Sequence, residues 1–412
     1  MKNFLYIAPI AILCCACNST TTKTVTSNAP VANTADTILP PVETLAPNSD
    51  YKSAFAGQTR IGGAKTRTPY QSRTISSNLN KPWSVTSLPD GRLLITEKEG
   101  ALRIVTTAGN IGAPITGLPA VNSKGQGGLL DTALDPAFGT NRMIYWTFSE
   151  NNKPGNLTAV AKGRLSDDEK KLENVSVIYR ATPAYNGTLH YGSRIIFDRQ
   201  GNIVISTGER SDLETRPQAQ SLNSGLGKII RITTDGKPAT GNPYLSRKDA
   251  RPEIYSYGHR NPQGLALHPE TGDIWESEMG PKGGDEVNLI KPGLNYGWPT
   301  ITYGIEYSGA QISGGATQKA GLEQPVYYWD PVISCSGMTF YSGNAIPEWK
   351  NNLFIGGLSS RHIIRLVIEN NKVVGEERLL ADQEQRFRDI TQGTDGALYA
   401  VTDEGRLYRI GK

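Results

Sequence analysis

The feature that most constrains the fold is a β-rich unit that recurs six times between residue 80 and the C-terminus. Each copy has an apolar segment, then a turn rich in Asp, Gly, Asn or Pro, then a second apolar segment, as in residues 82–85, 89–91 and 93–95. β-Rich units repeated at intervals of tens of residues are typical of propeller blades. The turn markers of the six copies are 45 to 79 residues apart, at Gly91, Gly139, Gly201, Gly272, Asn351 and Gly396. We therefore predict an all-β fold, a six-bladed β-propeller in one domain, although 412 residues alone would suggest two or three domains.

Closing such a ring requires one further strand. The sixth copy ends at Lys412 with three strands, which leaves an open sheet edge. Residues 70–75 have the β-propensity to supply the missing outer strand, so we expect the last blade to be closed by an N-terminal strand. The longest interval between turn markers contains residues 280–314, and long loops on a rigid scaffold tend to carry function.

The N-terminus has the pattern of an export signal. Residues 4–16 are apolar but too few to span a bilayer. The stretch at 13–17 resembles a bacterial lipobox, so we predict a lipoprotein signal peptide at 1–16 and acylation of Cys17; an ordinary secretory signal is the alternative. Residues 17–66, poor in charge, are interpreted as a flexible tether, and residues 67–412 as the propeller. We expect an exported protein at the periplasmic face of the outer membrane, in contact with the membrane only through its lipid.

Composition excludes two classes of protein. Hydrophobic residues make up 37% of the chain, charged residues 20%, and the formal net charge is only +4. A wholly disordered chain and a basic protein that wraps nucleic acid are both excluded by these values. Cys335 would be the one free thiol of the mature chain, so no intramolecular disulfide is expected. A monomer or a weak dimer is expected.

Polar side chains gather at the starts of the predicted inner strands. Because these strands border the central channel, residues at their starts converge on one mouth. His190 is one of them and is interpreted either as a general base or as a structural hydrogen bonder. Glu209, which follows the next strand, is either its carboxylate partner or an exposed turn acid. The other polar residues at these starts are Gln126, Arg260, Asn261, Arg386 and Arg388.

Three of these side chains are arginines. Arg260, Arg386 and Arg388 aimed at one mouth indicate a ligand with several carboxylates or a developing oxyanion, and the alternative is a set of solvated ion pairs. The glycine-rich loop 280–286 lacks the spacing of a phosphate loop. It is interpreted as an oxygen-rich calcium loop or as a solvated hairpin.

Several of these motifs resemble one family. Residues 258–266 (GHRNPQGLA), 276–281 (ESEMGP), 285–290 (DEVNLI) and 295–299 (NYGWP) are similar to those of the soluble PQQ-dependent aldose sugar (glucose) dehydrogenases. Residues 125–130, 190–194 and 386–389 add to the likeness, which spans about residues 80–412. The resemblance implies a six-bladed propeller that holds pyrroloquinoline quinone (PQQ) and Ca²⁺ and oxidises aldose sugars at C1 to lactones. The electrons would pass to an external acceptor, a quinone or a cytochrome.

The resemblance also implies residue roles. His190 would take the proton of the anomeric hydroxyl while hydride passes to the quinone, and Gln126 would lie beside the sugar and the cofactor. Arg260 and Asn261 would face the quinone oxygen that becomes negative. The residues implied in the remaining contacts are Arg386 and Arg388 for the quinone carboxylates, Tyr307 for closure over the quinone, the carbonyls of Gly280 and Pro281 for its calcium, and Glu286 and Tyr296 for a structural calcium.

The chain departs from the family pattern at three places. One is residues 329–331, where Trp329 matches the fifth-blade tryptophan of the family but the threonine that follows it there is missing. Glu209 stands where the glucose-specialised branch has an aspartate, and Ser359 or Arg361 would replace a fifth-blade lysine at a quinone carboxylate. Two other functions stay open. One is a non-catalytic propeller that binds a partner. The other is a calcium-dependent lactonase, which would need carboxylates converging on a metal, and the channel-mouth segments hold no such cluster.

Overall fold

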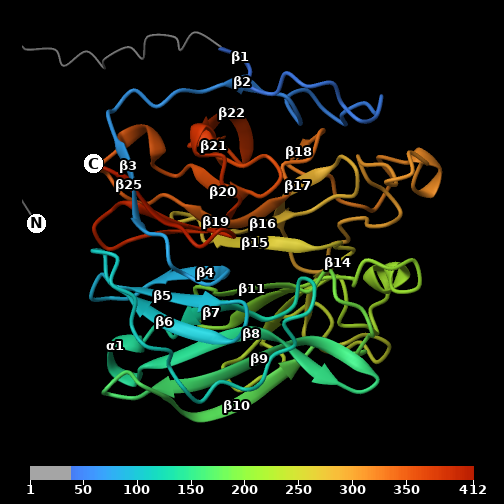
Figure 1. Cartoon of the computed structure of the whole chain (residues 1–412). Helices are drawn as coiled ribbons and strands as arrows, with labels where there is room; N and C mark the ends of the chain where they lie inside the picture. The colour runs from blue at the N-terminus through green and yellow to red at the C-terminus, as the bar shows by residue number, and fades with distance from the viewer. Residues whose placement is uncertain (1–38) are drawn as a thin grey trace, which may run out of the picture. The chain divides into compact units, whose positions relative to one another are not determined.

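Six β-sheets surround a central channel in the computed structural model, which describes residues 39–412 (Figure 1). The inner strands contact one another in ring order, β4, β7, β11, β15, β19 and β23, and β23 returns to β4. The predicted six-bladed propeller is therefore confirmed. The predicted signal peptide and Cys17 lie outside the described residues, and within residues 39–412 there is no helix long and apolar enough to cross a membrane.

The blades follow one another along the chain, and each begins with its inner strand. The first three blades contain β4 Pro82–Ser87, β5 Leu93–Glu97 and β6 Ala101–Val105; β7 Leu129–Leu134, β8 Met143–Asn152, β9 Gly155–Leu165 and β10 Leu172–Arg180; and β11 Gly192–Phe197, β12 Ile203–Thr207, β13 Lys228–Ile232 and β14 Ile254–Tyr257. The last three contain β15 Pro262–Leu267, β16 Ile274–Glu278, β17 Asp285–Ile290 and β18 Tyr327–Trp329; β19 Cys335–Phe340, β20 Leu353–Gly357, β21 Ile363–Glu369 and β22 Lys372–Leu379; and β23 Phe387–Gln392, β24 Leu398–Thr402 and β25 Leu407–Gly411.

Helices are short in the described chain. Gly139, one of the predicted turn markers, lies in α1 Phe138–Asn141, the connection between β7 and β8. Turns of 3-10 helix occur at Arg216–Gln220, Ser313–Gly315, Pro347–Trp349 and Ala381–Gln383.

An N-terminal strand closes the ring, as predicted. β3 Gln71–Ser76 pairs antiparallel with β25, so that Ser76 lies opposite Leu407 and Gln71 opposite Gly411. Figure 1 shows β3 beside β25 next to the C-terminus. The pairing joins the two ends of the propeller and removes the open edge of the last sheet.

The core lies between neighbouring blades. The second strands β5, β12, β16, β20 and β24 are buried along their whole length, because each blade packs with both faces against its neighbours. Large aromatic side chains fill these contacts, among them Trp146, Trp275 and Trp349. Full burial of one such side chain stabilises the fold by about 1.5–3 kcal/mol. The inner-strand starts are thereby held on a rigid frame.

Part of the segment predicted to be a flexible tether forms β-strands in the structure. β1 Leu39–Pro41 pairs with β2 Gly62–Gly63, and Gly63 pairs in parallel with Glu376 of β22. The described part of residues 17–66 is thus built onto the fifth blade and is not a flexible linker. The physical reason is that the outer edge of β22 offers free backbone groups, which β2 satisfies whatever its side chains are.

Candidate active site

A cavity of about 790 Å³ opens at the end of the ring where the inner strands begin. Most of the residues predicted at the channel mouth line it together, which confirms the predicted convergence. They are Gln126, His190, Arg260, Asn261, Gly280, Pro281, Tyr307, Arg386 and Arg388. Trp83, from the start of the first inner strand, and Asp285, from the 280–286 loop, also line it, and Lys98 and Asp403 line it without having been predicted.

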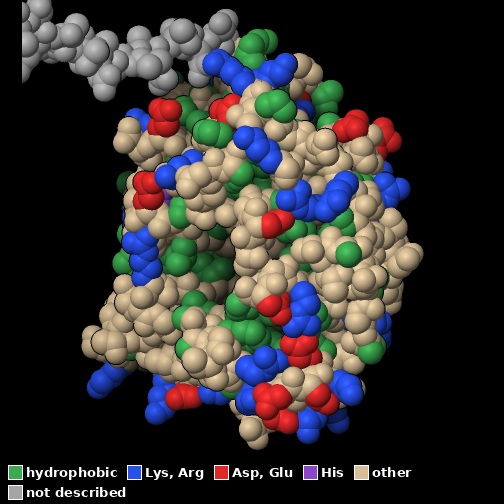
Figure 2. Space-filling view, turned by 90° about the vertical axis from the view of Figure 1, so that its left-hand side faces the viewer, with side chains coloured by type: hydrophobic (Ala, Val, Ile, Leu, Met, Phe, Trp, Pro, Cys, Tyr) green, Lys and Arg blue, Asp and Glu red, His purple; other side chains and the backbone are tan. Residues whose placement is uncertain are grey.

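Arg194 separates this cavity from a second one, of about 430 Å³, at the opposite end of the channel. The guanidinium lies 4.2 Å from the centre of the Trp83 ring, and its Nη1 is 2.9 Å from Asp389 and 3.5 Å from Asp131. Burial raises the pKa of Asp131 to about 7, although the charge of Arg194 opposes this. Figure 2 shows the face that carries α1, with a hollow whose walls include hydrophobic side chains. Arg194 thus lies between Trp83, which lines the first cavity, and its carboxylate partners, which line the second.

His190 lies in the wall of the cavity and forms a buried pair with Glu209, which does not line the cavity itself. His190 Nδ1 is 2.7 Å from Glu209 Oε1, and the two residues are 7% and 1% exposed. Burial lowers the pKa of His190 to about 4, the positive charge of Arg260 adds to this, and Glu209 opposes it. The imidazole is therefore neutral near pH 7. Donation from Nδ1–H to Glu209 leaves the Nε2 lone pair free to accept a proton.

Local backbone geometry sets this pair. His190 has φ +47° two residues before β11, and its backbone N–H donates to Gln126 Oε1 at 2.8 Å. A Cβ on Gly208 would lie 2.2 Å from the His190 carbonyl oxygen, so only glycine fits there. The glycine after β12 thus brings Glu209 beneath the imidazole.

Arg260 and Asn261 lie beside this pair at the start of β15. Arg260 Nη1 donates to the carbonyls of Met279 and Gly280 at 2.8 and 2.7 Å, and its Nε is buried without a partner. Asn261 Oδ1 accepts a hydrogen bond from the backbone of Gly192. The guanidinium is therefore held by its Nη1 and keeps donor capacity for a ligand.

Arg386 and Arg388 share one carboxylate that sequence reasoning missed. Asp403 accepts from Arg386 Nε at 2.8 Å and from Arg388 Nε at 2.8 Å. Burial raises the pKa of Asp403, but the two guanidiniums outweigh burial and the net shift is downward. Because one carboxylate faces two guanidiniums, the part of the cavity wall that these three residues form carries a net positive charge. Lys98 adds to it, although burial lowers the pKa of its ammonium.

The loop after β16 offers backbone oxygens to the cavity. Gly280 and Pro281 line it, and the Gly280 N–H donates to Asp285 Oδ1 at 2.8 Å. The Gly280 carbonyl already accepts one hydrogen bond from Arg260, and a carbonyl oxygen has a second lone pair. Oxygen donors next to the buried Asp285 carboxylate suit a calcium ion.

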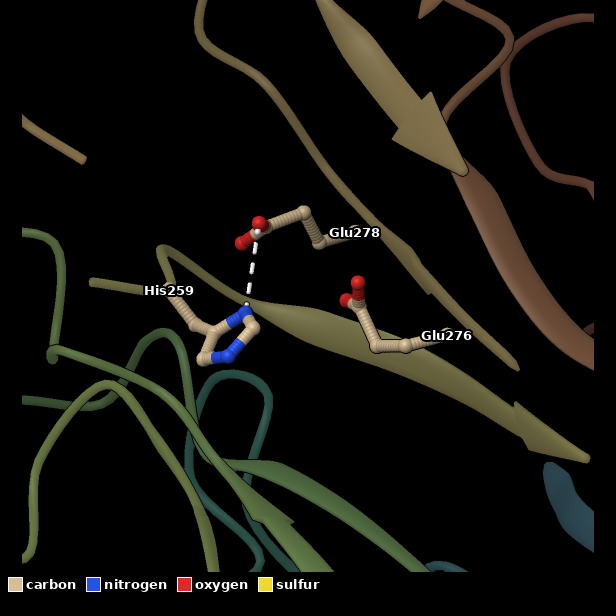
Figure 3. Close-up of side chains that lie close together, drawn as sticks. All are labelled: His259, Glu276 and Glu278. Carbon is tan, nitrogen blue, oxygen red and sulfur yellow. Dashed lines mark ion pairs between the residues drawn. The ribbon is translucent and has the colours of Figure 1, made fainter. Parts of the chain in front are cut away.

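Behind Arg260 lies a second group of oxygen ligands, on facing positions of β16 and β17. Glu276 lies opposite Asn288 and Glu278 opposite Glu286. Burial and the neighbouring carboxylates raise the pKa of Glu276 and Glu286 well above the usual range. Glu276 Oε1 and Asn288 Oδ1 are buried without partners, and His259 Nδ1 is 3.5 Å from Glu278 (Figure 3). Buried carboxylates without a counter-ion fit a divalent cation.

Tyr296 faces the same group through a small cavity that it shares with Glu278 and Glu286. Its hydroxyl accepts from the Lys291 N–H and donates to the Leu289 carbonyl. The phenol is therefore satisfied, and only the backbone carbonyl of Tyr296 is left to bind a metal.

Two predicted cofactor contacts do not reach the cavity. Ser359 Oγ points to the Val332 carbonyl, and Arg361, with φ +57°, donates to the Glu384 carbonyl. Neither residue lines the cavity, where Leu358 represents this segment. The prediction that Ser359 or Arg361 replaces the family lysine is therefore not supported by their positions. Tyr307 lines the cavity but is 75% exposed.

Comparison with known proteins identifies the same family that the sequence motifs resemble. The sequence profile of the Glucose / Sorbosone dehydrogenase family matches residues 79–409. The chain is 41% identical over 341 residues to the aldose sugar dehydrogenase YliI of Escherichia coli, covering 82% of this chain and 91% of that protein.

Solved structures agree with this match. A glucose dehydrogenase crystal structure, 45% identical, superposes with a TM-score of 0.80 over 83% of this chain and 99% of that one. The PQQ-bound form of an aldose sugar dehydrogenase from Streptomyces coelicolor is 28% identical, with a TM-score of 0.69 over 84% of this chain and 99% of that one.

Proposed function

Because the chain belongs to the glucose/sorbosone dehydrogenase family, we propose that it is a PQQ- and calcium-dependent enzyme that oxidises aldose sugars at C1 to lactones. The observation that carries the proposal is the neutral His190 in the wall of a cavity that three arginines also line, with Glu209 paired to it at 2.7 Å. This arrangement combines a base with a cationic site for an anionic cofactor.

His190 acts on the sugar hydroxyl. Its Nε2 would take the proton of the C1 hydroxyl, and PQQ, when bound, would supply the two-electron acceptor for the hydride of C1. Glu209 holds Nδ1–H and stabilises the imidazolium that forms. Gln126, whose Oε1 accepts from the His190 backbone, holds the base in place from the neighbouring blade.

The cationic side chains would hold the quinone. Arg386 and Arg388 would bind its carboxylates, and Arg260 with Asn261 would face the oxygen that becomes negative. Arg260 has a free Nε and is packed 5.1 Å from the centre of the Trp298 ring, which fixes its direction. A fixed guanidinium stabilises developing negative charge without reorganisation.

Calcium would occupy two places. The carbonyls of Gly280 and Pro281 would hold the ion next to the quinone, where it supplies Lewis acidity. Glu286 and the Tyr296 carbonyl would hold the structural ion, together with Glu278. The second ion would neutralise carboxylates that pack directly behind the backbone of Arg260.

The two other functions are less well supported. A lactonase needs carboxylates around a metal in the cavity, but the acidic group at Glu276 and Glu278 lies behind Arg260, and Asp403 is engaged by two arginines. A binding module does not require a neutral, buried histidine held by a carboxylate. Both alternatives predict no sugar-dependent electron transfer.

The cellular setting is part of the proposal. We infer from residues 1–17 that the protein is exported and lipid-anchored through Cys17, at the periplasmic face of the outer membrane. Its electrons would then pass to an external quinone or cytochrome. Labelling cells with a fatty-acid analogue tests the anchor: Cys17→Ala should abolish the label, and persistence of the label would contradict it.

Reconstitution tests the activity itself. PQQ and Ca²⁺ are added to purified apoprotein, and the reduction of a redox dye is followed with glucose, galactose or maltose. We expect dye reduction only when PQQ, Ca²⁺ and sugar are all present. Absence of sugar-dependent reduction with every sugar tried would refute the proposal.

A further inference from the structure

The N-terminal segment at residues 43–60, here called the strap, reaches the rim of the cavity. In Figure 1 the blue segment that follows β1 runs across the fifth blade beside β22 and β18. One of its residues, Asn48, lines the cavity directly. The strap precedes the range 79–409 that the family profile matches, so this part of the rim comes from outside the region shared with the family.

The strap binds one buried carboxylate with four hydrogen bonds. Asn48 donates to Asp330 Oδ1 from its backbone N and its Nδ2, at 2.8 and 2.7 Å. Ser49 donates to Asp330 Oδ2 from its backbone N and its Oγ, at 3.1 and 3.2 Å. Arg60 donates to the Asp330 carbonyl at 2.7 Å. Asp330 is 5% exposed, so these bonds satisfy a charge that would otherwise be buried alone.

Asp330 is followed by residues that form the cavity wall. Pro331, Val332 and Ser334 all line the cavity, on the side where Asn48 lies. Gly283, in the loop next to Gly280, is pressed against the same carboxylate, because a Cβ there would lie 2.9 Å from Asp330 Oδ1. The strap therefore contributes one lining residue and holds the segment that contributes three more.

A second contact of the strap is made with a neighbouring segment of the chain. Gln58 is fully buried, and its Oε1 lies 3.0 Å from the Tyr303 hydroxyl, while its Nε2 donates to the Pro325 carbonyl at 2.9 Å. Tyr303 and Pro325 belong to the insertion between β17 and β18, which also carries Tyr307 at the cavity. The strap thus contacts two neighbouring segments that lead to the cavity, at residues 330–334 and 303–307.

We propose that the strap determines the size of the aldose that the cavity accepts. Asn48 and the wall that Asp330 positions narrow the rim where the part of a sugar beyond the oxidised ring would lie, and so favour short aldoses over oligosaccharides. Asp330 is a positioning residue, since it acts through Asn48 and residues 331–334. The inference rests on the proposed aldose oxidation, which supplies the substrate class.

The test compares Asn48→Ala and Asp330→Asn with the wild type. For each holoenzyme, kcat and KM are measured with glucose, maltose and maltotriose. We expect the ratio of kcat/KM for maltotriose to that for glucose to rise about fivefold or more, which corresponds to about 1 kcal/mol. The readout is the ratio between sugars within each variant, so a change of kcat that is common to all three sugars does not count toward the prediction. A defect of folding alone would lower the rate with all three sugars alike.

Glu43→Gln is the matched control. Glu43 also belongs to the strap, but it pairs with Arg378 at 2.7 Å and does not line the cavity. We expect its sugar ratio to equal that of the wild type. An unchanged or lowered maltotriose ratio in both Asn48→Ala and Asp330→Asn would overturn the proposal, and so would an equal change in Glu43→Gln.

A binding measurement separates this inference from the proposed function. The affinities of glucose and maltotriose for each variant are measured by calorimetry in the absence of turnover. If the wild type oxidises no sugar, the proposed function fails, and the strap is then judged by whether Asn48→Ala raises the relative affinity for maltotriose. An unchanged ratio of affinities would refute the strap's role.

Discussion

Replacing Glu209 by glutamine tests how the base is held. The carboxylate accepts the Nδ1–H of His190 at 2.7 Å, and it also accepts the backbone N–H of Ser211 at 3.1 Å. Glutamine keeps the length of the side chain and an acceptor oxygen but removes the charge. The variant therefore isolates the contribution of the negative charge from that of packing.

The expected loss can be worked from these contacts. Hydrogen bonds to charged groups contribute about 1.5–3 kcal/mol and neutral ones about 0.5–1.5 kcal/mol, so the imidazolium-like transition state loses about 1–2 kcal/mol. At about 1.4 kcal/mol for each factor of ten, kcat should fall about 5- to 30-fold. KM should change little, because Glu209 does not line the cavity.

The pH dependence gives a second readout. His190 must be neutral to act, and burial lowers its pKa to about 4, so kcat/KM should be flat near pH 7 and fall as the pH drops toward 4. Glu209 opposes this lowering, so its loss lowers the pKa further. The acid limb of the kcat/KM profile of Glu209→Gln should therefore move to lower pH, even though the plateau of that profile is lower than in the wild type.

The assay is steady-state dye reduction by reconstituted enzyme between pH 4 and 8. Glu214→Gln is the matched control, because Glu214 is an exposed acid of the same loop and loses the same charge. It should leave both kcat and the pH profile unchanged. Wild-type kcat and an unmoved acid limb in Glu209→Gln would refute the account of this pair.

Two further predictions concern the cofactor and the metal. Arg388→Gln should weaken PQQ binding to the apoprotein at least tenfold in a fluorescence titration, since a charged hydrogen bond contributes about 1.5–3 kcal/mol; Arg361→Gln should not, and equal effects would contradict the assigned positions. Calcium at about 100 times its Kd should stabilise the wild type by about 2.7 kcal/mol and raise Tm by about 3–4 °C. Glu286→Gln should lose most of this calcium-dependent rise in a thermal melt, and a full rise in that variant would exclude Glu286 as a ligand.

The repeats made much of the site predictable. Once the inner strands were located, His190, Arg260 and Arg388 had to converge, because the starts of propeller strands share one mouth. β3 was predictable because three strands in the sixth unit left an edge that had to be covered.

The rest depended on contacts that sequence patterns do not carry. Asp403 follows β24, and its pairing with the two arginines at the start of β23 is visible only in three dimensions. Arg361 was wrongly expected at the quinone because its left-handed φ turns it toward Glu384. The strap was mistaken for a tether because Asn48 and Ser49 bind Asp330, about 280 residues away, mostly through groups that any polar loop contains.

The central claim is that His190 is the base that starts sugar oxidation by PQQ in this cavity. The most direct measurement mixes anaerobic holoenzyme with glucose in a stopped-flow instrument and follows the absorbance of the bound quinone. Wild type should show reduction of the quinone within one turnover, while His190→Ala should bind PQQ with similar affinity and show none. Quinone reduction at the wild-type rate in His190→Ala would contradict the claim.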